Sequence, residues 1–467
     1  MHYEPHRQRC SSKKGMSIVE ILVALAVVAV TIVTALQLYF MLSLRTSEYP
    51  VLSLLQNEAL AVFTVEAGKS FDDAESYSAV NKSVLTEVNV TQVTNFIKEV
   101  AIKVSSLTHE RKKVELGFEL YDYVRSPGGE SCEASVFDQW ENVSVYGGVD
   151  IGEGNRATDI KVLNSFVYLS ANSATGSKED LYIIDARNPQ APVILSKLNT
   201  GPGIEALVVA SGYVFAANTS SNSQLQVIDI SDKEHPHLAA ELKVPHADAS
   251  TTPGLSRSIY FSEDTIYLGT TKNTGSEFHI IDVENPLAPD YKSGFETDTL
   301  VHGIFVHKNR AYIATPNFEQ MRIMDVSDAV NPLQLSGISL SGWQTQEGKS
   351  IYGFMDHIYL GRSVGGFNNS NNHEIIHFNT AEAAPYVSQM DSIDIGASVN
   401  GMVARQPFMY LATSHSEKEL QVWDGEYGEM VFSADMPSAL LAIQCDGNTL
   451  YGALDSNDAL RIFTSDE

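Results

Sequence analysis

The chain has 467 residues, of which 43% are hydrophobic and 19% are charged, and its formal net charge is −27. This composition is typical of globular proteins, and the length predicts more than one folding unit. The negative charge argues against nucleic-acid binding and against attraction to anionic membranes. The three cysteines, Cys10, Cys132 and Cys445, form no CxxC pair, so no cysteine-based metal site is expected.

The first predicted element is an apolar helix that begins just after a basic cluster. Residues 21–44 contain no charged side chain, and a helix of these 24 residues is long enough to cross a bilayer core of about 30 Å. Four basic residues lie between positions 7 and 14, which predicts that the N-terminus stays cytoplasmic. A secretory signal peptide has a similar start, but no clean small-residue cleavage site follows the apolar run.

The residues in front of this helix form a specific junction. They read GMSIVE over residues 15–20, followed by ILVALAVVAV. The junction resembles the leader of type IV prepilins and type II secretion pseudopilins. The resemblance implies that prepilin peptidase removes residues 1–15 by cutting after Gly15 and methylates the new amino terminus at Met16. Phenylalanine is commonest at the position of Met16, and methionine is a tolerated departure. An ordinary signal anchor with a chance glutamate at the interface is the alternative interpretation.

Glu20 is the one acidic residue at the edge of this apolar run. A carboxylate in that position is costly unless it has a partner. The resemblance implies a filament in which Glu20 pairs with the freed amine of Met16 on a neighbouring subunit, and such a buried pair sets register more than it adds stability. Other pilin-like subunits are therefore expected partners through this helix, and the inner membrane is expected to hold the chain before assembly.

The N-terminal helix is expected to span residues 16–67, with residues 21–44 as its transmembrane part. Pro50 predicts a kink within it. Apolar residues continue at helical spacing beyond this proline, as in a pilin-like stalk.

Residues 68–135 are predicted to form a small α+β connector or a reduced pilin head. Within this segment the polar residues 71–83 are typical of a loop, and residues 89–107 have apolar residues at helical spacing. Residues 114–124 alternate apolar and polar side chains, which predicts a strand.

Residues 136–467 contain internal repeats. In register they read DLYIIDARNP, QLQVIDISDKEHP, EFHIIDVENP, QMRIMDVSDAVNP, EIIHFNTAEAAP and ELQVWDGEYGE, with ALRIFTSDE at the end. Four short strands in each unit of about 40–50 residues predict a β-propeller. The repeats resemble those of LVIVD-repeat propellers, with an L-x-IVD-x-x-x-P core. The expected fold is therefore mainly β, a seven-bladed propeller that follows the helix and connector.

One polar position ends the third strand of each repeat. The register gives Asp185, Asp229, Asp282, Asp325, His377, Asp424 and Thr464. An aspartate here bonds its own backbone and holds the turn, so a structural role is expected and a catalytic role is not.

The seventh repeat lacks its outermost strand. The alternating residues 141–148 are predicted to supply it and so to close the ring, which removes exposed sheet edges. Cys132 lies just before this strand, and Cys445 lies in the same predicted blade. An extracytoplasmic disulfide between them is possible. However, Cys445 falls on the innermost strand, and a blade is wider than disulfide reach unless the approach loop folds across it.

A ring of candidate ligand-binding residues lies two positions before the first aligned apolar residue of each innermost strand. It contains Thr158, Glu205, Arg257, His302, Lys349 and Asn400, with Leu441 in the seventh repeat. Such a ring suits a small polar ligand or a partner's loop, and a solvated channel rim is the plain alternative. The chain has no nucleophile elbow, phosphate-binding glycine loop or HExxH motif, so no catalytic residue, metal or cofactor is expected.

These features together predict a minor type IV pilin-like subunit that displays a propeller at a filament tip, for adhesion or protein interaction. A propeller is much wider than a helical shaft, which favours a low-copy or tip position. The expected ligand is an unidentified surface, protein or glycan, and not a nucleic acid. The expected location is a single inner-membrane pass with an extracytoplasmic propeller, and after assembly the pilus or cell surface. The alternatives are a type II secretion pseudopilin and a membrane-tethered propeller enzyme that uses Glu205, Arg257 and His302.

Overall fold

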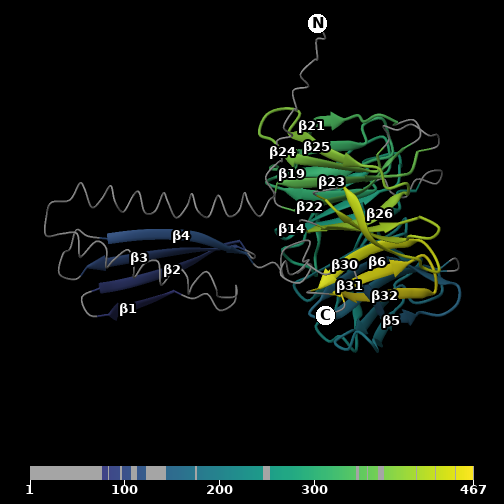
Figure 1. The fold of residues 1–467 in the computed structure, drawn as a ribbon, viewed down its shortest axis with the longest axis horizontal. Coiled ribbons are helices and arrows are strands. Elements are labelled where there is room, and N and C mark those ends of the chain that lie inside the picture. Colours follow the sequence, from purple (N-terminus) through teal and green to yellow (C-terminus); the bar gives the residue numbers. More distant parts are fainter. Residues whose placement is uncertain are drawn as a thin grey trace, which may run out of the picture. The chain divides into compact units, whose positions relative to one another are not determined.

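The computed structural model describes the greater part of the chain from residue 76 onward. The described residues are 76–81, 84–94, 97–106, 113–121, 143–173, 176–245, 253–342, 346–354, 356–365, 373–405, 408–425, 428–446 and 449–465. They belong to two compact units, residues 1–121 and residues 122–467 (Figure 1). The described elements are all strands. The described residues therefore contain no helix sufficiently long and apolar to span a membrane. The predicted leader, the helix over residues 16–67 and Glu20 lie outside the described residues.

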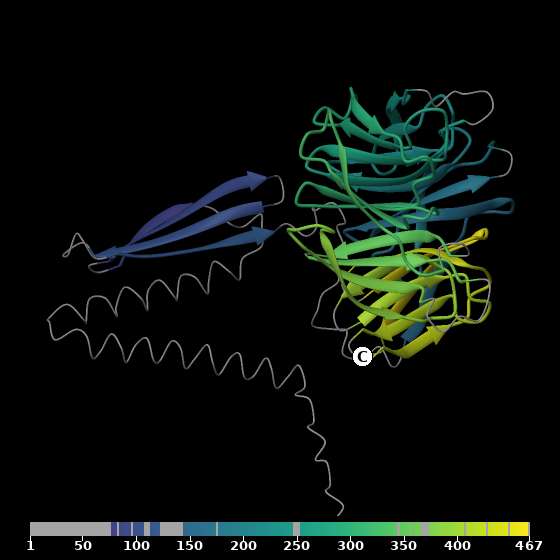
Figure 2. The same ribbon diagram turned by 90° about the horizontal axis from the view of Figure 1, so that it is seen from above.

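The first unit contains a four-stranded antiparallel sheet in the order β1-β2-β3-β4, whose strands lie side by side in both views (Figures 1 and 2). The strands are β1 (Tyr77–Asn81), β2 (Val84–Thr94), β3 (Ile97–Ser106) and β4 (Lys113–Tyr121). The strand predicted over residues 114–124 is confirmed by β4. The loop predicted over residues 71–83 is wrong at its end, because β1 lies there.

The helix predicted over residues 89–107 is wrong. This segment contains the end of β2 and all of β3, which pair as a hairpin around Thr94 and Ile97. Burial here has a period of two, since Ile102 and Val104 are buried and Lys103 between them is not. Many residues in the segment are β-branched, and such side chains favour strands over helices.

The second unit is a β-propeller of seven four-stranded sheets, numbered here as blades in chain order from the innermost strand outward. Blade 1 contains β6 (Asn155–Leu163), β7 (Phe166–Ser173), β8 (Leu181–Asp185) and β9 (Val193–Leu198). Blade 2 contains β10 (Ile204–Ala210), β11 (Tyr213–Asn218), β12 (Leu225–Asp229) and β13 (His237–Leu242). Blade 3 contains β14 (Ser256–Ser262), β15 (Thr265–Thr270), β16 (Phe278–Asp282) and β17 (Asp290–Phe295). Blade 4 contains β18 (Gly303–His307), β19 (Arg310–Ala314), β20 (Met321–Asp325) and β21 (Leu333–Ile338).

The last three blades repeat this pattern. Blade 5 contains β22 (Gly348–Phe354), β23 (His357–Arg362), β24 (Ile375–Thr380) and β25 (Val387–Ile393). Blade 6 contains β26 (Val399–Arg405), β27 (Phe408–Thr413), β28 (Leu420–Asp424) and β29 (Glu429–Ala434). Blade 7 contains β30 (Leu440–Asp446), β31 (Thr449–Leu454), β32 (Asp458–Ser465) and, as its outermost strand, β5 (Val143–Asp150). The innermost strands of neighbouring blades contact one another around the ring, including β30 with β6.

Blade 7 is closed by a strand that comes from before the first blade. Strand β5 pairs antiparallel with β32, with Phe463 opposite Val145 and Thr464 opposite Ser144. Figure 1 shows β5, coloured early in the sequence, beside the yellow β32. This confirms the prediction that the segment ENVSVYGG completes the seventh blade. The closed ring leaves no innermost strand without neighbours on both sides.

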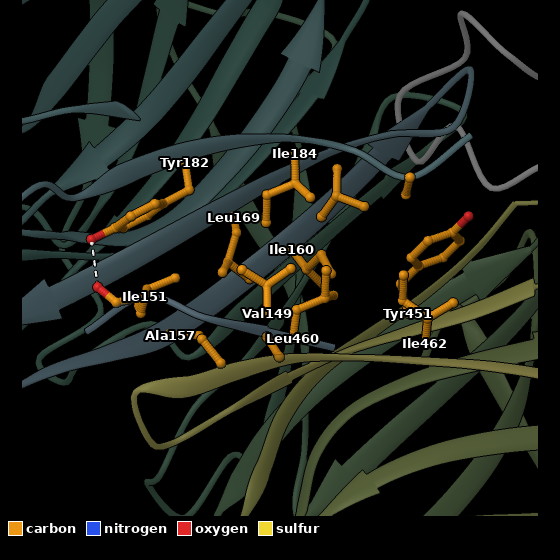
Figure 3. Packing of buried hydrophobic residues seen from close by; sticks show 14 of the residues in the cluster. Val149, Ile151, Ala157, Ile160, Leu169, Tyr182, Ile184, Tyr451, Leu460 and Ile462 are labelled. Atoms are coloured by element: carbon orange, nitrogen blue, oxygen red, sulfur yellow. Dashed lines mark hydrogen bonds between the residues drawn. The ribbon is translucent and has the colours of Figure 1, made fainter. Parts of the chain in front are cut away.

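The seam between blades 7 and 1 is a buried apolar core (Figure 3). Val149 from β5, Ile160 from β6 and Leu460 from β32 all belong to it and are at most 8% exposed. The Tyr182 hydroxyl donates a hydrogen bond to the Ile151 carbonyl at 3.3 Å, so the polar end of this buried ring is satisfied. Burial of apolar side chains from both ends of the propeller sequence therefore stabilises the closure.

The predicted turn role of the repeat aspartates is confirmed in the first four blades. Asp185, Asp229, Asp282 and Asp325 each accept a hydrogen bond from the backbone N–H two residues later. The position predicted in blade 5 is wrong by two residues. Asn379, not His377, faces the first residue of β23, as Asp229 faces the first residue of β11. The segment EIIHFN has no aspartate to mark the register, which explains the shift.

A buried acid or amide precedes the third strand in six blades, a feature that the sequence analysis missed. These residues are at most 3% exposed: Asp180, Gln224, Glu277, Gln320, Glu374 and Glu419. Each bonds backbone that follows the fourth strand of its own blade, as when Asp180 Oδ1 accepts from the Thr200 N–H at 2.9 Å. They therefore fix the loops that lead to the next innermost strand. Their sequence signal is the first letter of each aligned repeat: D, Q, E, Q, E and E.

Candidate ligand site at the starts of the innermost strands

The candidate ring residues share a backbone feature. In six blades the pairing of the first two strands shifts register at the ring position, so that this residue is bulged out of the ladder: Thr158, Glu205, Arg257, Lys349, Asn400 and Leu441. His302 immediately precedes β18 instead, and its N–H donates to the Ala314 carbonyl at 2.9 Å. A β-bulge re-aims its side chain and is often found beside functional sites. The propeller therefore presents the ring side chains through a repeated local distortion.

Two ring residues hold neighbouring blades together. Thr158 Oγ1 donates a hydrogen bond to the Ile204 carbonyl of blade 2 at 2.6 Å. Asn400 Nδ2 donates to the Leu440 carbonyl of blade 7 at 2.7 Å and to Ser414 Oγ at 2.9 Å. These polar groups are already used by the protein, so their role in this structure is to link blades.

The ionisable ring residues lie on four consecutive blades, from 2 to 5. Arg257 Nη1 and Glu205 Oε1 form an ion pair at 2.5 Å, and their side chains are 36% and 16% exposed. This pair joins blades 2 and 3 at the start of their innermost strands. It is partly buried, so water screens it less than a pair on the open surface.

His302 lies next to these charges in blade 4. Its side chain is 16% exposed, and Nε2 is 3.7 Å from Glu347 Oε2. Nε2 is buried and has no hydrogen-bond partner among the described residues. Burial, together with the positive charges of Arg257 and Lys349, lowers the pKa of His302 to about 4. The imidazole is therefore neutral at neutral pH.

Lys349 completes the cluster in blade 5. Burial lowers its pKa, with a further decrease from Arg257 that Glu347 opposes. No residue in the described part of the chain makes a direct ion pair with the Lys349 side chain. The amine of Lys349 therefore lies in a partly buried position without a direct counter-ion.

Glu347 belongs to the same cluster, although sequence reasoning did not select it. It lies two residues before Lys349, outside the aligned innermost strand, and its side chain is 53% exposed. The signal for it was weak, because one acid in a polar inter-blade loop is common. We name Glu205, Arg257, His302, Glu347 and Lys349 the charged cluster. It contains two acids, two bases and one neutral imidazole, a set that can hold an ionic group through several hydrogen bonds.

The described residues contain no group of three or more histidine, cysteine, aspartate or glutamate side chains suited to holding a metal ion. The pair of Arg257 and Lys349 would also repel a cation. The chemistry of the charged cluster therefore favours an organic ionic group over a metal.

A separate groove lies between blades 1 and 2, away from the ring. It has a volume of about 350 Å³ and is lined by Phe166, Asp185, Arg187, Leu195 and residues 231–234. Arg187 and Lys233 both lie over the Phe166 ring, at 5.3 and 5.2 Å from its centre. Arg187 already forms an ion pair with Asp185 at 2.5 Å.

Cys445 lies in β30, the innermost strand of blade 7, as predicted. It is fully buried and disulfide-bonded. Cys132 lies outside the described residues, so its pairing with Cys445 remains a prediction.

Comparison with known proteins supports the repeat and the fold. The model of the LVIVD repeat matches residues 205–243, which cover blade 2 from Glu205 through β13. This chain carries an LVIVD repeat within a seven-bladed β-propeller. No curated protein sequence matches the chain.

Solved structures similar to this chain include two propellers. One is the β-propeller domain of Cps50 (Swd1) from Myceliophteria thermophila, with a TM-score of 0.49, 12% identity, and coverage of 68% of this chain and 99% of that chain. Another is Sqt1 from Saccharomyces cerevisiae, with a TM-score of 0.47, 9% identity, and coverage of 69% and 100%. Neither similarity is close enough to inform function.

Proposed function

We propose that this chain is a minor type IV pilin-like subunit that displays its β-propeller as an interaction module at a filament tip. The observation on which the proposal rests is the junction GMSIVE, followed by 24 residues without charge and, much later, by a closed propeller. A glycine, a glutamate and an apolar run in one register are specific to the prepilin-like leader that the junction resembles.

Two features of the propeller support this role. The closing strand β5 precedes blade 1 in the sequence and pairs with β32, so the propeller is a closed ring. The disulfide bond of Cys445 suits an oxidising, extracytoplasmic compartment. Because the charged cluster has binding groups and no nucleophile with an adjacent base, we propose binding and not catalysis as the activity.

The substitution Gly15→Ala tests the proposed maturation. In cells that assemble the filament, the wild-type chain should begin at methylated Met16 by mass spectrometry, and immunogold label on the propeller should lie at filament tips. Gly15→Ala should leave residues 1–15 attached and abolish the tip label, because the peptidase needs the glycine. The control is Ser12→Ala, which changes the leader outside the junction and should mature normally. An intact amino terminus in the wild-type chain would contradict the proposal.

A type II secretion pseudopilin remains the second candidate, since the same junction resembles both families. In that case the label should follow a secretion complex in the envelope, and Gly15→Ala should block export of a cargo protein without changing adhesion. A membrane-tethered enzyme would instead lose turnover on substitution of Glu205, Arg257 and His302 while its location stayed the same.

A further inference from the structure

The charged cluster holds two nitrogen groups that make no hydrogen bond or close ion pair with other described residues, since the nearest approach recorded for them is the 3.7 Å between His302 Nε2 and Glu347 Oε2. Lys349 has no direct ion pair in the described part of the chain, and His302 Nε2 is buried without a hydrogen bond. Both groups are close enough to Arg257 for its charge to lower their pKa values. Partly buried polar groups without partners cost free energy in the folded protein. Their position together, on adjacent blades, suits a ligand that supplies the missing partner.

The missing partner is negatively charged. Arg257 and Lys349 together supply two positive charges, and His302 supplies a further ring nitrogen. Guanidinium and ammonium groups form their strongest hydrogen bonds with carboxylates and phosphates. Arg257 is shared with Glu205 through a single Nη1 contact, which leaves other guanidinium donors for a second acceptor.

The surroundings limit how much negative charge the ligand can bring. Glu205 and Glu347 flank the three nitrogen groups, and the chain as a whole has a net charge of −27. A polyanion, such as an acidic polysaccharide, would therefore be repelled at long range. A peptide with one carboxylate and one basic residue is complementary to the cluster. Its carboxylate can pair with the basic side chains, and its basic residue can pair with the two glutamates.

We propose that Arg257, His302 and Lys349 form a subsite that binds one carboxylate of a peptide segment of a partner protein, with an adjacent basic residue of that segment near Glu205 and Glu347. This inference deepens the proposed interaction role of the propeller and rests on it. The bulges at Arg257 and Lys349 are the backbone feature that turns these side chains into the ring.

Binding is coupled to protonation of His302. In the free protein, burial and the charges of Arg257 and Lys349 keep the imidazole neutral. The acid that faces Nε2 is Glu347, at 3.7 Å. A bound carboxylate adds a negative charge and raises the pKa of His302. The complex then binds more protons than the free protein, so affinity increases as the pH falls towards the raised pKa.

The test is a titration of the purified full-length chain in detergent with the peptide acetyl-Gly-Lys-Asp-Gly-amide. The matched probe replaces Asp with Asn, and oligogalacturonate serves as the polyanion. We expect the Asp peptide to bind more tightly than both other probes. The substitution Lys349→Met should weaken its binding roughly tenfold, because a charge-assisted hydrogen bond is lost. Lys161→Met, on the innermost strand of blade 1, is the control and should bind as the wild type does.

The pH dependence gives an independent result. The affinity of the wild-type chain for the Asp peptide should rise between pH 8 and pH 5, and His302→Gln should remove this rise. Equal binding of the Asp and Asn peptides, no loss with Lys349→Met, no binding of the Asp peptide at millimolar concentration, or preference for oligogalacturonate would each overturn the subsite. Because the titration uses purified protein, these outcomes do not depend on whether Gly15→Ala abolishes filament display.

Discussion

Two aspartates at the ends of strand β8 show how position decides the chemistry of one residue type. Asp180 lies just before the strand and is 2% exposed, and burial raises its pKa to about 6. Asp185 lies at the other end, where hydrogen bonds from Arg187 lower its pKa. An aspartate carboxyl group is therefore harder to ionise just before this five-residue strand than at its other end.

We expect Asp180→Asn to stabilise the protein above pH 6. In the folded chain Asp180 holds its proton up to a pKa of about 6, whereas an unfolded aspartate ionises near pH 4. The wild-type stability therefore falls as the pH rises through this window. Asparagine keeps an oxygen for the Thr200 N–H and never ionises. The gain in the free energy of unfolding at pH 7.5 should be on the order of 2 kcal/mol and should vanish near pH 4.

Asp185→Asn is the matched control, measured by the same urea titrations across pH. The pKa of Asp185 is lowered in the folded state, so its contribution is present at neutral pH and is lost as the pH falls. Asp185→Asn should therefore reduce stability at pH 7 and have little effect at low pH. The same pH dependence for both variants would show that the two environments do not differ as described.

Much of the residue-level arrangement follows from the repeats, and the rest depends on packing that the repeats do not contain. The turn aspartates were predictable because an Asx turn is local. The ring positions could be selected because equivalent positions of a propeller surround one axis, and their role in ligand binding stays a prediction. Asp180 and its equivalents were missed because polar residues are usually exposed, and only the three-dimensional fold shows the loop that they bond. Glu347 was missed for another reason, because one exposed acid in a polar inter-blade loop is common.

At the scale of elements, strand β5 is the piece on which closure of the ring depends. An added Cβ at Gly147 would lie 2.3 Å from the Pro189 carbonyl oxygen, in the turn of blade 1. Other blades make the same junction with a side chain, as when Ser293 Oγ of blade 3 donates to the Ala329 carbonyl of blade 4 at 2.6 Å. In blade 7 the backbone of Gly147 instead lies directly against the Pro189 carbonyl of blade 1, and this close approach requires glycine.

We therefore expect Gly147→Val to destabilise the propeller by about 1–3 kcal/mol through overpacking. Val145→Thr is the control on the same strand, because Val145 is 55% exposed. Its effect should stay within about 0.5 kcal/mol. Urea unfolding followed by tryptophan fluorescence measures both changes. Equal effects of the two substitutions would mean that the contact with Pro189 does not limit this position.

The hairpin of β2 and β3 shows where element prediction from a single sequence fails. Residues 89–107 have apolar side chains at spacings that fit both a helix and a strand. Short apolar segments are ambiguous in this way, and pairing with a neighbouring strand decides between the two. In the propeller the same ambiguity does not arise, since repetition of the pattern over seven blades supports one interpretation.

At the scale of the whole propeller, the closure couples the two ends of the second unit. Asp150 ends strand β5, and Asn457 lies just before strand β32. These two residues are 307 positions apart in the sequence, yet Asn457 Nδ2 donates a hydrogen bond to the Asp150 carboxylate at 3.0 Å. On the other side of the seam, Gln444 Oε1 accepts from the Val162 N–H at 2.6 Å. The apolar core at this seam includes side chains from both β5 and β32, whereas the Gln444 bond joins the innermost strands of blades 7 and 1.

Loss of either closing strand should therefore have the same consequence as loss of both. One variant ends the chain after Asn457 and so lacks β32, and another replaces residues 143–150 by a Gly-Ser segment of equal length. Each should lose most of the free energy of unfolding, because the buried side chains of Val149 and Leu460 belong to one core. The double variant should be no less stable than either single variant, since coupled sites are not additive. Limited proteolysis and urea unfolding measure the three chains, and additive losses would show that the first six blades do not depend on closure of the seventh.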